Sequence, residues 1–190
     1  KGVHEGSSNR MAVVATHFPG RGSADREPDE EIATVRKSLE QLKQIELYPF
    51  FAVTGNNEDQ AEITDGLLLS HIRYQGFQGN IRATTKPVSF DAAALEQIML
   101  LPEFNDWRLN GGVIVSDDLG TDAVRKFVDP LNTGYDARQV ARSALLAGND
   151  LLYLGNIIAT GDPDSHTTVV RTIDYFVQKY EDDSAFQVRV

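Results

Sequence analysis

The chain has 190 residues, 41% apolar and 24% charged, a composition typical of one globular domain. Its net charge of −10 argues against nucleic acids and anionic membranes as partners, and no apolar run approaches the roughly 20 residues that cross a bilayer. The absence of cysteine excludes disulfides and thiolate metal sites and leaves the cellular location unknown.

The sequence predicts four units, each a strand followed by a helix. The strands are short apolar runs, and the helices carry apolar residues three and four positions apart. In chain order we expect a strand at 12–18 with a helix at about 32–47, a strand at 66–72 with a helix at about 91–102, a strand at 113–115 with a helix at about 136–147, and a strand at 150–154 with a helix at about 166–180. Two polar loops are expected, at 56–60 and 161–164.

Alternating strands and helices imply a parallel sheet with right-handed crossovers. Four units are half the number in a closed (β/α)8 barrel, which usually needs about 250 residues. We therefore predict that residues 1–190 form a single half-barrel of four βα units. Its exposed sheet edges would be covered by a missing preceding segment or by a second copy of the chain. The alternative is a small doubly wound sheet that is complete in itself.

The third strand runs directly into two carboxylates, Asp117 and Asp118. In parallel α/β proteins the chemistry collects at the carboxyl ends of the strands, where the backbone is rigid and a ligand has access. Asp117 is therefore a candidate nucleophile, with capping of the next segment as its structural alternative. Asp118 faces the other way by the two-residue period of a strand, which favours a capping role.

The strand ends carry a resemblance to a known family. His17-Phe18-Pro19-Gly20-Arg21-Gly22 resembles the Lys-His-Phe-Pro-Gly-His-Gly signature of glycoside hydrolase family 3. Residues 70–72 resemble its Ala-His-Ile strand end, 115–119 its nucleophile strand and 147–152 its last barrel strand, with matching order and spacing. The likeness covers nearly the whole chain and is greatest to the bacterial β-N-acetylhexosaminidases. In that family these segments form the second half of a (β/α)8 barrel.

The resemblance implies a retaining glycoside hydrolase that removes terminal β-linked N-acetylhexosamine or related β-glycosides. Asp117 would be the nucleophile, and a second group about 5 Å away would protonate the leaving oxygen. His17, Arg21, His71 and Asp118 would contact the carbohydrate substrate. Neither a metal nor another cofactor is expected, because no His, Asp and Glu cluster has metal-ligand spacing.

The chain departs from the family at the proton donor. The hexosaminidase branch uses the histidine of an Asp-Ser-His triplet, where this chain has Glu27-Pro28-Asp29, and the signature lysine is Thr16 here. Asp25, Glu27 and Asp29 are the three carboxylates of this loop that could replace the donor. Asp29 is interpreted as the cap of the helix predicted from 32, which leaves Glu27 as the expected donor.

These departures keep two other hypotheses open. One is a carbohydrate-binding half-barrel that has lost turnover, and the other is a half-barrel whose main property is self-association. Trp107, the only tryptophan, precedes the third strand and is expected to pack in the core rather than stack on a sugar.

Overall fold

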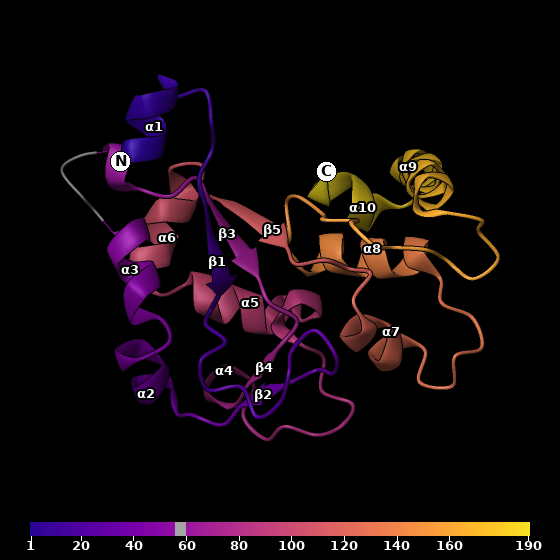
Figure 1. Cartoon of the computed structure of the whole chain (residues 1–190), viewed down its shortest axis with the longest axis horizontal. Helices are drawn as coiled ribbons and strands as arrows, with labels where there is room; N and C mark the ends of the chain where they lie inside the picture. The colour runs from indigo at the N-terminus through magenta and orange to yellow at the C-terminus, as the bar shows by residue number, and fades with distance from the viewer. Residues whose placement is uncertain (56–59) are drawn as a thin grey trace.

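The computed structural model describes residues 1–55 and 60–190, so the polar loop expected at 56–60 lies almost entirely outside the described part. A parallel sheet with the order β1-β3-β5 occupies the middle of the molecule (Figure 1). Its strands are β1 Val14–Phe18, β3 Gly66–Leu69 and β5 Val113–Ser116. A second parallel pair, β2 Thr34–Val35 with β4 Arg73–Tyr74, lies among the loops that follow these strands.

Helices lie to either side of this sheet in the view of Figure 1. They are α1 Gly2–Ser7, α2 Leu39–Gln44, α3 Tyr48–Thr54, α4 Gln75–Gln78, α5 Ala92–Met99, α6 Pro102–Leu109, α7 Asp122–Val128, α8 Ala137–Ala147, α9 Ser165–Asp182 and α10 Ser184–Arg189, with 3-10 turns at Gln60–Glu62 and Val88–Phe90. Aspartates start several of them, because their carboxylates accept the free backbone N–H groups of the first turn. Asp91, Asp136 and Asp164 cap α5, α8 and α9 in this way.

The central sheet is buried on one face and open on the other. Leu67, Leu69 and Ile114 are buried in a core that they share with α2, α3, α5 and α6. The alternate residues Leu68 and Val115 are only partly buried. Trp107 belongs to this core, and its indole N–H donates to the carbonyl of Thr64 at 2.8 Å, in agreement with its expected packing role.

The helix predicted over 32–47 is wrong in its first half. Thr34 and Val35 form β2, and α2 begins only at Leu39. Two interactions fix this boundary: the Asp25 carboxylate accepts from the Thr34 N–H at 2.8 Å, and Ser38 and Gln41 form a reciprocal capping box. The buried Ile32 and Val35 therefore reach the core from extended backbone. The apolar spacing that predicted one helix over 32–47 in fact spans a short strand, a loop and α2.

The strand predicted over 150–154 is reduced to a single parallel bridge between Leu151 and Val115. Hydrogen bonds continue past it irregularly, since Tyr153 N–H donates to the Ser116 hydroxyl at 2.9 Å. The helix expected after it is present as α9, but its apolar residues divide between two faces. Val169 and Phe176 pack inward, whereas an outward stripe of Val170, Ile173, Val177 and Tyr180 is 42–57% exposed.

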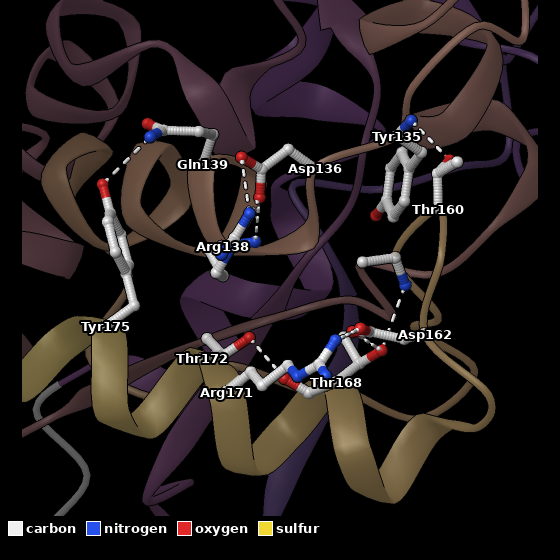
Figure 2. A network of polar contacts seen from close by, with 11 residues as sticks. Tyr135, Asp136, Arg138, Gln139, Thr160, Asp162, Thr168, Arg171, Thr172 and Tyr175 are labelled. Carbon is white, nitrogen blue, oxygen red and sulfur yellow. Dashed lines mark hydrogen bonds and ion pairs between the residues drawn. The ribbon is translucent and has the colours of Figure 1, made fainter.

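Polar contacts join α9 to α8 and to the loop between them (Figure 2). The Gln139 amide donates to the Tyr175 hydroxyl at 3.0 Å, which links the two helices. Asp162 in the loop accepts from the Thr168 hydroxyl at 2.8 Å and forms an ion pair with Arg171. These contacts fix α9 against the rest of the fold. Among the described residues, no helix is long and apolar enough to cross a membrane.

Candidate active site

The carboxyl ends of β1 and β5 bring together residues that are a hundred positions apart in the chain. His17 lies near the end of β1, Arg21 follows it in the next loop, and Asp117 follows β5 directly. With Asp29 and Asn156 they line a cavity of about 410 Å³, which is within the size range of small-molecule sites. The sheet topology accounts for this meeting, because the ends of parallel strands share one edge.

Asp117 is 8% exposed and both of its carboxylate oxygens are engaged. One accepts from the backbone N–H of Asp118 at 2.9 Å, and the other lies 2.8 Å from the guanidinium of Arg21. The second oxygen is also 4.0 Å from Nε2 of His17. The side chain is thus held in one orientation at the wall of the cavity by a cation and a backbone donor.

Asp118 also lines the cavity, and its side chain organises the neighbouring backbone. Its carboxylate accepts from the N–H of Gly120 at 2.8 Å and from the backbone and side-chain N–H groups of Asn156 at 3.2–3.3 Å. This is the capping role that was expected for Asp118 from the alternation of side chains along a strand. The same contacts join the loop after β5 to the loop that follows residue 154. The sugar contact assigned to Asp118 stays a prediction.

His71 lies behind the cavity and is 3% exposed. Its Nε2 is 3.1 Å from the carbonyl of Asp118, and its Nδ1 is 2.8 Å from the hydroxyl of Ser89. A carbonyl only accepts, so Nε2 donates to it, and in the neutral imidazole Nδ1 then accepts from the Ser89 hydroxyl. Burial lowers the pKa of His71 and favours that form. His71 therefore supports the Asp117–Asp118 backbone, and its predicted sugar contact would require it to become accessible.

His17 is the more accessible histidine, with a side chain 37% exposed beside Asp117. Partial burial and the positive charge of Arg21 lower its pKa, which outweighs the opposite effect of Asp117. A neutral imidazole at this position can donate or accept a hydrogen bond from a sugar hydroxyl.

The three acids of the loop after β1 have different environments. The Asp29 carboxylate accepts from Arg21 at 2.8 Å and lines the cavity, so its expected role as a helix cap is wrong: α2 begins ten residues later, behind Ser38. Asp25 binds the Thr34 N–H and Arg26; burial alone would raise its pKa, but these hydrogen bonds hold it below the usual value. Glu27 is exposed and is not among the residues that line the cavity.

Two supporting residues were missed from the sequence. Asn156 holds Asp118, and Ser89 holds His71. The position of Asn156 shortly after the fourth apolar run was a usable signal, because polar residues at strand ends line such cavities. Ser89 carried no signal, since it lies in a 3-10 turn far from any strand end. No group of three metal-binding side chains occurs within residues 1–55 and 60–190.

The resemblance to glycoside hydrolase family 3 is confirmed by comparison with known proteins. Residues 1–171 match the model of the glycosyl hydrolase family 3 N-terminal domain. A β-hexosaminidase of Hydrogenovibrio crunogenus is 25% identical over 172 residues, which are 85% of this chain and 42% of that protein. One from Idiomarina loihiensis is 28% identical over 157 residues, which are 82% of this chain and 39% of that protein. The chain thus spans about two fifths of the length of these relatives.

Solved structures agree on the fold. A family 3 β-N-acetylglucosaminidase from Paenibacillus sp. str. FPU-7 superposes with a TM-score of 0.66 at 20% identity, covering 96% of this chain and 30% of that one. At this level of identity the similarity establishes the parallel α/β architecture alone.

Proposed function

Because this chain belongs to glycosyl hydrolase family 3, we propose that it carries the catalytic residues of a retaining glycosidase. The single observation that carries the proposal is Asp117, an oriented carboxylate at the carboxyl end of β5 that faces a sugar-sized cavity. In the proposed reaction Asp117 attacks the anomeric carbon while a second acid protonates the leaving oxygen. Water then attacks the glycosyl-enzyme, and the second acid, now a base, takes its proton.

The separation of carboxylates favours Asp29 over Glu27 as the second acid. Asp29 and Asp117 each have an oxygen 2.8 Å from the same Arg21 nitrogen, so these oxygens lie at most twice that distance apart. Retaining glycosidases place their two carboxyl groups about 5–5.5 Å apart. The Arg21 guanidinium contacts both carboxylates and holds their oxygens at this separation.

The substrate class follows from the relatives. Several proteins similar to this chain are named β-hexosaminidases, which supports terminal β-linked N-acetylhexosamine as the substrate, with related β-glycosides as the broader class. His17, Arg21, His71 and Asp118 remain the proposed sugar-binding set. Of these, His17 and Arg21 are the best placed, because both line the cavity and are partly exposed.

We further propose that residues 1–190 form one half-barrel. Three features support this: one open sheet face, the two exposed sheet edges and the partial coverage of longer relatives. A doubly wound sheet would have both faces covered by helices, which does not fit this one. Completion would come from a preceding segment or from a second copy of the chain.

The direct test is nitrophenol release from a panel of nitrophenyl β-glycosides, with N-acetylglucosaminide, glucoside and xyloside as members. Asp117→Asn should lower the rate by about a thousandfold or more, because the nucleophile is lost while the shape is kept. Asp174→Asn, an exposed acid on α9, is the matched control and should leave the rate unchanged. An equal rate in wild type and Asp117→Asn would overturn the assignment.

The second candidate is a carbohydrate-binding half-barrel without turnover. The observation that favours it is that Arg21 forms ion pairs with both candidate catalytic acids, Asp117 and Asp29. This candidate predicts calorimetric binding of N-acetylglucosamine or a β-linked oligomer, with no hydrolysis of any activated glycoside. Measurable turnover that disappears in Asp117→Asn would exclude it.

A further inference from the structure

A buried carboxylate lies directly beneath the loop that carries Arg21. Glu46, in the turn between α2 and α3, is only 6% exposed. A Cβ atom placed on Gly20 would lie 2.8 Å from its Oε2, and one placed on Gly22 would lie 3.5 Å away. Gly20 also has a φ of +125°, so this position needs glycine both for its backbone and for the space that Glu46 fills.

Glu46 and Arg21 both have unused hydrogen-bonding capacity. Within the described residues, Oε1 of Glu46 and Nε of Arg21 are buried without a hydrogen-bond partner. The Tyr74 hydroxyl donates to the Gly20 carbonyl at 2.6 Å from the same side. Burial and then the negative charge of Glu46 raise the pKa of Tyr74.

An isolated buried carboxylate is costly unless a cation or donors compensate it. Arg21 is the cation between Gly20 and Gly22, the two glycines that lie against Glu46. Its side chain is 22% exposed and extends toward Asp117 and Asp29. We propose that Glu46 is a positioning residue, which holds the Arg21 guanidinium in place on the Asp117 and Asp29 carboxylates. The consequence for catalysis rests on the proposed function, whereas the effect on Arg21 does not.

The first readout is independent of activity. Phenylglyoxal modifies accessible arginines, and peptide mapping by mass spectrometry gives the rate at Arg21. Glu46→Gln should raise that rate several-fold, while Glu40→Gln, an exposed acid on α2, should leave it unchanged. Glu46→Asp keeps the charge with a shorter side chain and should lie nearer to wild type than Glu46→Gln does. This order separates the effect of charge from that of lost volume.

The second readout is kinetic. If the chain turns over nitrophenyl glycosides, Glu46→Gln should lower kcat by a larger factor than it changes KM, with partial rescue in Glu46→Asp. If the wild type has no turnover, the proposed glycosidase fails, and the Arg21 modification rate still decides the role of Glu46. A folded Glu46→Gln protein in which Arg21 is modified at the wild-type rate, with only the melting temperature lowered, would overturn the proposal.

Discussion

At the scale of single residues, the site depends on one guanidinium shared between two carboxylates. Arg21 binds Asp117 and Asp29 at equal distances of 2.8 Å, whereas Glu27 lies outside the cavity. The functional question is therefore which acid protonates the leaving oxygen after a sugar has entered. A proton donor contributes most when the leaving group is poor, because a good one departs without protonation.

We expect Asp29→Asn to slow hydrolysis about a hundredfold or more for a phenyl glycoside and far less for a dinitrophenyl glycoside. Glu27→Gln, in the same loop, should show no such dependence on the leaving group. The measurement is kcat/KM for a series of aryl β-glycosides against the pKa of the released phenol. If kcat/KM depends more steeply on the phenol pKa in Glu27→Gln than in wild type, and Asp29→Asn shows no such change, the donor is Glu27 and not Asp29.

At the scale of elements, Asp150 joins three parts of the fold. Its carboxylate accepts from Arg108 of α6, from the Ile114 N–H of β5 at 2.8 Å and from Arg189 of α10 at 2.8 Å. Burial alone would raise the pKa of Asp150, but these donors hold it below the ordinary value. Asp150 is the first residue of the strand predicted over 150–154, and the structure shows it at the amino-terminal side of β5 as a structural clamp.

Asp150→Asn should lower the free energy of unfolding by about 2 kcal/mol at neutral pH, between the values for exposed and buried ion pairs. A lowered folded-state pKa means that the stabilisation is present above the unfolded pKa and is lost as the pH falls through the folded one. Urea melts of both proteins from pH 7 to pH 2.5 should therefore converge in acid. Glu31→Gln, which removes the exposed pair with Arg26, is the control and should change little. If the difference in the free energy of unfolding persists in acid, Asp150 stabilises the fold through packing and not through its charge.

At the scale of the whole molecule, the chain exposes apolar side chains at both edges of its central sheet. The outer edge of β1 is unpaired among the described residues, and Val14 on it is 39% exposed. Leu151 and Tyr153, beyond the other edge, are 57% and 51% exposed. Exposed edges and apolar faces promote association, and natural proteins block them with charges.

Sedimentation velocity over a range of concentrations should accordingly detect association of the isolated chain. Val14→Lys introduces a charge at the β1 edge and should shift the protein toward monomer. Val188→Lys, at a position 90% exposed on α10, should not. A chain that stays monomeric at every concentration would contradict completion by a second copy and leave a preceding segment as the way to cover the edges.

The sequence by itself determined the three strands of the central sheet and the place of Asp117. Both depend on local information: an uninterrupted β-branched run defines a buried strand, and the residue after it must emerge at the sheet edge. The aspartate caps of α5, α8 and α9 are local in the same sense, since each acts on backbone three residues away or less.

Only the tertiary structure decided which loop acid faces Asp117, why His71 is buried and what Glu46 does. These features depend on the path of the loops after β1 and β5. The sequence of a loop has no regular hydrophobic repeat that would predict where each side chain points. Asp29 reaches Arg21, and the boundary of α2 moves to Ser38, because Thr34 and Val35 pair with β4 instead of extending the helix. Contacts between segments far apart in the chain overrode the local preference, and the candidate site is made of such contacts.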